Sequence, residues 1–152
     1  MNSIIVLDTG VLGASVHQNT VVRNPILTWV ANHLANGNSF RIPEIADYEL
    51  RRELIRNNFA QSIADLDKLK AALGYIPLNT PTMLEAAALW AVARQAAKPT
   101  AHDHALDGDV ILCAQTIRLQ AAYPNDTVIV ATTNLGHLER FVTASIWQNI
   151  AV

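Results

Sequence analysis

The sequence has one cysteine and few charged residues, and each scarcity excludes a class of protein. Cys113 alone cannot form a disulfide within the chain, so disulfide-stapled secreted domains are excluded and a reducing compartment is expected. Charged residues make up 16% of the chain, and the formal net charge is -2. This balance excludes a generally basic coat for nucleic acid and leaves room only for a local basic rim.

Long hydrophobic runs are also missing, which argues against a membrane protein. Residues 1–7 are apolar but reach the acidic Asp8 at once, whereas a signal peptide needs a basic start and a longer apolar run. No stretch approaches the ~20 apolar residues of a membrane span. We therefore expect a cytoplasmic protein that does not associate with membranes.

Hydrophobic residues are plentiful, at 51% of the chain, so a well-packed core is expected. No internal repeat and no linker rich in Gly, Pro or Ser divides the sequence, which predicts a single domain over residues 1–152. The low charged fraction also favours an apolar surface patch that a protein partner covers.

Short apolar segments alternate with longer segments that have helical character. The clearest early segment is Ser3–Leu7, a run rich in β-branched residues that suits a strand buried on both faces. The alternation predicts an α/β fold with a central, mainly parallel sheet. Strands are expected over 3–7, 39–42, 75–78, 127–131 and 143–147, helices over 11–16, 24–35, 43–57, 61–73, 80–97, 107–121 and 134–141, and a loop over 98–106.

Acidic residues stand where such a fold would bring them together. Asp8 directly follows the first strand, and ligands of parallel sheets bind beyond the carboxyl ends of the strands. Glu49 lies beside the apolar stripe of its helix, and Asp109 shares a helical face with apolar residues. Carboxylates that converge repel one another unless a cation neutralises them, and oxygen ligands of this kind suit Mg²⁺ or Mn²⁺. Such an ion can support hydrolysis of a phosphodiester bond.

Simpler interpretations of the same acids remain open. Glu49 can belong to a surface network of Glu and Arg side chains. Asp107 can cap its helix, and Asp109 in the first turn is favoured by the helix dipole.

Four motifs, in this order and spacing, resemble the PIN-domain nucleases and most closely the VapC-like toxins of toxin–antitoxin pairs. The resemblance covers nearly the whole chain. The motifs are Ile4-Ile5-Val6-Leu7-Asp8-Thr9, Tyr48-Glu49-Leu50-Arg51-Arg52-Glu53-Leu54, Asp107-Gly108-Asp109-Val110-Ile111-Leu112-Cys113-Ala114 and Ala131-Thr132-Thr133-Asn134-Leu135-Gly136-His137-Leu138.

The resemblance implies a three-layer α/β/α fold and a metal-dependent endoribonuclease. It assigns Asp8, Glu49 and Asp109 as catalytic acids that hold one Mg²⁺ or Mn²⁺ ion, with Asp107 as a possible further ligand. The family often has a fourth acid after the late strand, where this sequence has Asn134. An amide oxygen can ligate a metal without adding charge.

The resemblance also implies partners. RNA is the expected substrate, with Arg51, Arg52, Arg56 and Thr132 as candidate contacts, although the arginines also fit an ordinary solvated helix face. A small antitoxin and a homodimer are the expected protein partners. The alternative, favoured by Asn134, is a catalytically weakened PIN-like module that binds RNA or a protein without cleaving.

Overall fold

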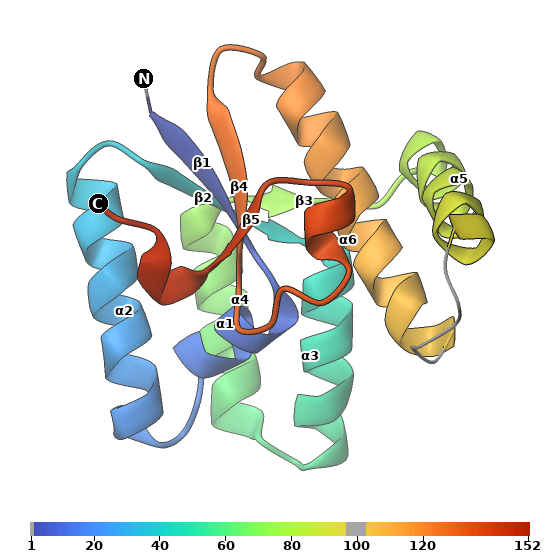
Figure 1. The fold of residues 1–152 in the computed structure, drawn as a ribbon. Coiled ribbons are helices and arrows are strands. Elements are labelled where there is room, and N and C mark those ends of the chain that lie inside the picture. The colour runs from blue at the N-terminus through green and yellow to red at the C-terminus, as the bar shows by residue number, and fades with distance from the viewer. Residues whose placement is uncertain (1, 97–102) are drawn as a thin grey trace.

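A five-stranded parallel sheet forms the centre of the molecule, in the computed structural model that describes residues 2–96 and 103–152 (Figure 1). The strand order is β3-β2-β1-β4-β5, with every neighbouring pair parallel. In the register of the two central strands, Leu7 of β1 lies beside Ala131 of β4. Residues that follow these strands therefore emerge side by side at one edge of the sheet. The strands are β1 (Ser3–Leu7), β2 (Ser39–Pro43), β3 (Tyr75–Ile76), β4 (Thr127–Thr132) and β5 (Ala144–Ile146).

Helices cover both faces of the sheet, which confirms the expected three-layer α/β/α fold. Successive residues of β1 point to opposite faces, as the period of a strand requires. Ile5 and Leu7 pack with residues of the first four helices, whereas Ile4 and Val6 pack with residues of the sixth. The helices are α1 (Thr9–Ser15), α2 (Thr20–Ala35), α3 (Glu44–Arg56), α4 (Ala60–Leu73), α5 (Thr80–Ala96) and α6 (Asp103–Ala122), with short 3-10 turns η1 (Leu138–Arg140) and η2 (Trp147–Asn149).

Two helices, α2 and α6, begin four residues earlier than the sequence predicts. α2 begins at Thr20, because the Asn19 side chain accepts a hydrogen bond from the Val21 N–H and caps it there. Pro25 therefore lies inside the helix. α6 begins at Asp103 within the expected loop, of which residues 98–102 lie outside the described part of the chain. Asp107 is consequently not the cap of this helix.

The edge strands are shorter than expected. β3 has only two residues, and β5 only three. The expected helix after β4 is reduced to η1, since Asn134 forms a turn with Gly136 instead of capping a helix. No helix of the described residues is long and apolar enough to cross a membrane.

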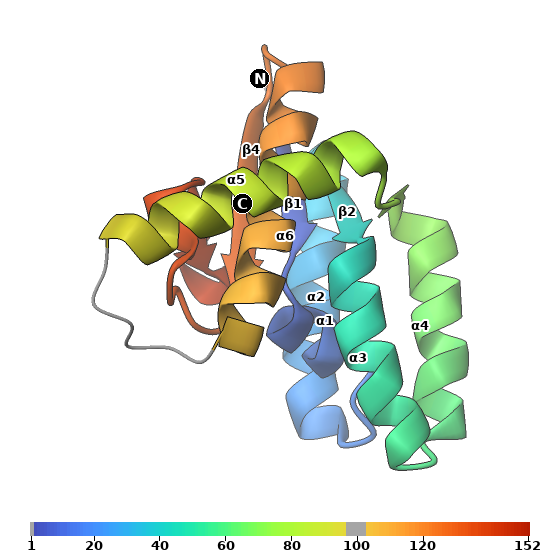
Figure 2. The same cartoon turned by 90° about the vertical axis from the view of Figure 1, so that its right-hand side faces the viewer.

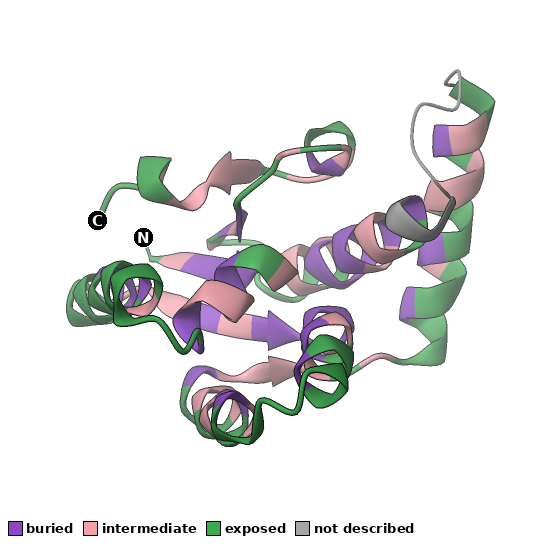
Figure 3. Ribbon diagram, turned by 90° about the horizontal axis from the view of Figure 1, so that it is seen from below, coloured by how far each residue is buried: buried purple, intermediate pink, exposed green. Residues whose placement is uncertain are grey.

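α5 stands apart from the central layers. Figure 2 shows it lying across α6, and Figure 3 shows that most of its residues are exposed or only half-buried. Among its buried residues, Ala86 and Ala93 pack with Leu106, Val110 and Ala114 of α6. α5 and α6 therefore form a small apolar cluster beside the main core.

Candidate active site

Asp8 directly follows β1 and is held from two sides. Its Oδ1 atom accepts a hydrogen bond from the backbone N–H of Thr9 at 2.7 Å, which caps α1. Its Oδ2 atom accepts a hydrogen bond from the hydroxyl of Thr132 at 2.6 Å. Thr132, the last residue of β4, is fully buried. The pairing of β1 with β4 thus fixes the position and the orientation of the Asp8 carboxylate.

Glu49 lies in the middle of α3, where it meets both α1 and α6. Its Oε1 atom accepts a hydrogen bond from the Thr9 hydroxyl at 2.9 Å. Gly108 of α6 lies against the same carboxylate, since a Cβ atom there would be 2.8 Å from Oε2. A side chain at position 108 would therefore displace the Glu49 carboxylate from this position. Thr9 and Gly108 thus contribute to the site without having been predicted, although both adjoin predicted acids in the sequence.

Asp109 completes the group from α6. Burial, and then the charges of Asp8 and Glu49, raise the pKa of Asp109 to about 6. Both charges that act on it are negative, so the three carboxylates repel one another. The nearby Cys113 thiol has a pKa raised to about 12, by burial first and then by Asp109 and Asp8. Cys113 therefore stays a protonated thiol and is unsuited as a nucleophile or a metal ligand.

The donor set of these acids suits a hard divalent cation. The residues offer carboxylate oxygens, which Mg²⁺ and Mn²⁺ prefer, and their mutual repulsion is what a cation would relieve. The arrangement is open: within residues 2–96 and 103–152, no group of three or more His, Cys, Asp and Glu side chains is close enough to form a complete ligand set. Mg²⁺ commonly keeps several of its waters and binds through one or two carboxylates, which is compatible with this spacing.

No protein-family model and no curated protein matches the sequence, but solved structures with a similar fold exist. One similar structure is VapBC2 from Rickettsia felis, bound to a DNA fragment from the promoter. The match has 16% identity and a TM-score of 0.67, and covers 93% of this chain and 97% of that chain. The fold is VapC-like. VapBC-1 from nontypeable Haemophilus influenzae is similar too, with 15% identity, a TM-score of 0.61, and coverage of 96% and 99% of the two chains.

Within the VapC-like fold, Asp107 does not join the other acids. Residues Asp107 and Asp109 are two positions apart on α6, so their side chains leave the helix about 200° apart. Asp107 is exposed and lines a pocket between α5 and α6. The expectation that it is a further metal ligand is therefore not supported by its position.

Asn134 lies in the loop beside Asp109 and shapes that loop. Its Oδ1 atom accepts a hydrogen bond from the Gly136 N–H at 3.1 Å. Gly136 has a φ of 47°, and a Cβ atom there would be 3.9 Å from Oδ2 of Asp109. Asn134 thus has a structural role in the turn, and its role as a metal ligand stays a prediction.

The candidate substrate contacts on α3 differ from one another in their surroundings. Arg51 forms ion pairs with Asp47 at 2.8 Å and Asp67 at 2.7 Å, and the hydrogen bond to Asp47 is the largest cause of its raised pKa. Its guanidinium is therefore committed to packing α3 against α4. Arg56 pairs with Glu53, whereas Arg52 lies 5.2 Å from the ring centroid of Tyr48 and is exposed.

Thr132 is corrected from a substrate contact to a positioning residue. Its side chain is inaccessible to solvent, so no RNA can reach it in this structure. Its hydroxyl instead lies within hydrogen-bond distance of the Asp8 carboxylate and of the Asn134 backbone N–H.

The repulsion at Asp109 predicts a pH-dependent effect of Asp109→Asn on stability, measured with EDTA present. Because folding raises the pKa of this carboxyl from its ordinary 3.8 to about 6, the folded state binds more protons than the unfolded state between these values. Wild-type stability should therefore fall relative to the variant as the pH rises through this range. Above about pH 7 the variant should be more stable by about 1 kcal/mol, because water screens part of the repulsion at a half-buried group. Urea unfolding from pH 4 to 8 measures the difference, and a constant difference would contradict the prediction.

Proposed function

We propose that this chain is a metal-dependent endoribonuclease that acts in the cytoplasm as the toxin of a toxin–antitoxin pair. The observation that carries the proposal is that Asp8, Glu49 and Asp109 lie together at one edge of the parallel sheet. Burial and the negative charges of the other two acids raise the pKa of Asp109. The likeness of the fold to the VapBC structures supports the same activity.

Each residue of the group has a distinct part in the proposed reaction. Bound Mg²⁺ or Mn²⁺ would supply an activated water and would offset the charge that builds on the phosphate. Asp8, Glu49 and Asp109 are the residues that would hold it. Thr132 and Thr9 orient the first two carboxylates through their hydroxyls. A carboxylate of the group accepts the proton of the attacking water, and exposed Arg52 is the remaining candidate on α3 for a phosphate contact.

Cleavage of single-stranded RNA in Mn²⁺ and in EDTA tests this proposal. We expect cleavage with Mn²⁺ or Mg²⁺, none in EDTA, and recovery when the metal is restored to the EDTA-treated protein. Cleavage that persists in EDTA would contradict the metal dependence. Binding of RNA without cleavage under every metal condition would instead favour the weakened binding module, which Asn134 at the place of a fourth acid also favours.

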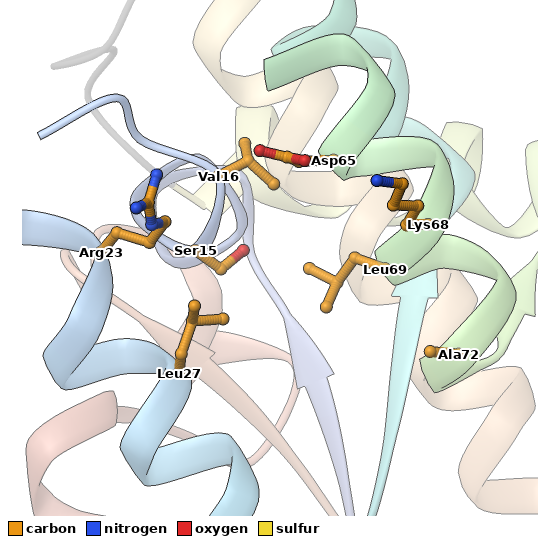
Figure 4. Close-up of a pocket in the computed structure, with 8 residues that line it drawn as sticks. All are labelled: Ser15, Val16, Arg23, Leu27, Asp65, Lys68, Leu69 and Ala72. Carbon is orange, nitrogen blue, oxygen red and sulfur yellow. The ribbon is translucent and has the colours of Figure 1, made fainter. Parts of the chain in front are cut away.

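Two apolar pockets beside α1 support an antitoxin partner. One has a volume of about 400 Å³ and lies next to the acids, where Leu50, Leu54 and Phe59 line it together with Gly10. The second, of about 360 Å³, lies between α2 and α4. Figure 4 shows Leu27 and Leu69 entering it from opposite sides, with Arg23 and Lys68 at its rim. Both pockets are lined by Val16, so one apolar segment of an antitoxin could follow them past α1 toward the acids.

A homodimer is the other assembly we propose. Leu84 and Val92, which are two helical turns apart on α5, are 68% and 54% exposed and offer apolar surface to a partner. Burial against a second copy would remove this surface from water.

A further inference from the structure

A pocket of about 400 Å³ lies between α5 and α6, on the side of α6 that faces away from Asp109. Its floor is apolar, formed by the buried residues Ala86 and Val110. Trp90 and Met83 of α5 and Ile111 of α6 line it as well. Among the described residues that line it, Asp107 alone carries a charge. The pocket therefore combines apolar walls, one indole ring and one carboxylate.

This combination suits a flat, neutral ring that has hydrogen-bond donors on one edge. Single-stranded RNA is bound largely by stacking of its bases on aromatic side chains, and by hydrogen bonds to their Watson–Crick edges. Trp90 supplies an aromatic ring. Arg94 lies 5.7 Å from the centroid of that ring, which places a positive charge beside the pocket. A nucleobase can therefore stack in the pocket between its apolar walls, with Trp90 as the aromatic ring.

The carboxylate of Asp107 selects among the bases. An ionised carboxylate only accepts hydrogen bonds, and its two oxygens match two adjacent N–H donors. Guanine offers such a pair, at N1 and the 2-amino group. Adenine and cytosine each place an acceptor beside their single amino donor, and uracil flanks its N–H with two carbonyl oxygens. The pocket is thus complementary to guanine.

The pocket and Asp109 lie on opposite sides of α6, and a helix with its side chains is ~10–12 Å across, a span that a few nucleotides of one RNA strand can cover. Asp107 and Asp109 are separated by Gly108 alone, and Gly108 is in contact with Glu49. We infer that the pocket between α5 and α6 binds a guanine base of the RNA near the cleaved phosphate, with Trp90 as the stacking residue and Asp107 as the residue that sets base specificity. This inference rests on the proposed ribonuclease activity.

Binding of single nucleotides tests the pocket without any cleavage. Guanosine, inosine and adenosine 5′-monophosphates are titrated into the protein in EDTA, with tryptophan fluorescence as the signal. We expect guanosine monophosphate to bind about tenfold more tightly than the other two, since inosine lacks the 2-amino group and adenosine lacks the N1–H. Asp107→Asn should remove this preference, and Trp90→Ala should weaken all three nucleotides. Equal affinities, or a preference that survives in Asp107→Asn, would overturn the inference.

Matched variants keep the result interpretable. Asp126→Asn removes a carboxylate from the opposite end of the sheet, before β4, and should keep the guanine preference. Trp90→Phe retains an aromatic ring and should retain binding, which separates loss of stacking from loss of folding.

Cleavage of uridine oligomers that contain one guanosine, inosine or adenosine separates this inference from the nuclease activity. Cleavage of all three at equal kcat/KM would overturn the pocket and leave the nuclease standing. Selective binding of guanosine monophosphate by a protein that cleaves no RNA would overturn the nuclease and leave the pocket standing. We expect about tenfold faster cleavage of the guanosine oligomer, lost in Asp107→Asn.

Discussion

Asp8→Asn is expected to lower RNA cleavage at least 100-fold while the fold stays intact. The substitution removes one anionic oxygen from the group that holds the cation, and a neutral amide oxygen is a weaker ligand for a divalent ion. It also reduces the repulsion on Asp109, so its pKa should fall toward the ordinary value. Initial rates of cleavage across a range of Mn²⁺ concentrations measure the loss.

The hydrogen bonds around position 8 explain why the variant should fold. An asparagine oxygen can still accept from the Thr9 N–H, and its amide N–H₂ can donate to the Thr132 hydroxyl, which then donates to the Asn134 carbonyl. Thermal unfolding with EDTA present should therefore show equal or higher stability for the variant. Asp126→Asn serves as the control for a change in net charge and should cleave RNA at the wild-type rate.

The growth rate of cells that express the protein provides a second measurement of the effect of Asp8→Asn. The wild-type chain expressed alone should slow growth, and the Asp8→Asn chain should not. A folded Asp8→Asn protein that retains full cleavage, or that arrests growth like the wild type, would refute the assignment of Asp8.

The positions of the central strands and of Asp8, Glu49 and Asp109 on their elements were predictable, because the local sequence determines them. A β-branched apolar run followed by Asp8 defines both the strand and the residue at its end. Parallel pairing with β4 then places Asp8 at the edge of the sheet where the site lies. Glu49 and Asp109 are placed by helical periodicity, which survives small errors in where a helix begins. α6 begins four residues before Asp107, and yet the face that carries Asp109 is unchanged.

The other candidate residues depend on contacts between distant parts of the chain. Arg51 looks like a free cation on α3, but Asp67 of α4 neutralises it across 16 positions of sequence. Asp107 was expected to join Asp109 at the site, but it lines a separate pocket that α6 forms with α5. Thr132 was expected to be accessible at the end of a strand, but it is completely buried in the folded chain. None of these neighbours is visible in the local pattern of the sequence.

Thr132→Val is expected to lower cleavage about 10- to 100-fold, the usual cost of removing a residue that orients a metal ligand. Valine has nearly the shape of threonine but no hydroxyl, so Oδ2 of Asp8 loses its donor and the Asn134 N–H loses its acceptor. Loss of these two part-buried hydrogen bonds should also reduce the free energy of unfolding by about 1 kcal/mol. Cleavage rates against Mn²⁺ concentration, together with urea unfolding, measure both effects.

The comparison with Thr132→Ser separates orientation of Asp8 from simple packing. Serine keeps the hydroxyl and loses the methyl group, so it should lose stability in this buried position while cleavage stays near the wild-type rate. In Thr132→Val the larger effect should be on cleavage. The Mn²⁺ concentration needed for half-maximal cleavage should rise, because a misoriented Asp8 holds the ion less well. If Thr132→Val cleaves like the wild type at every Mn²⁺ concentration, the Thr9 N–H alone orients Asp8, and Thr132 serves only to join β4 to the loop that follows it.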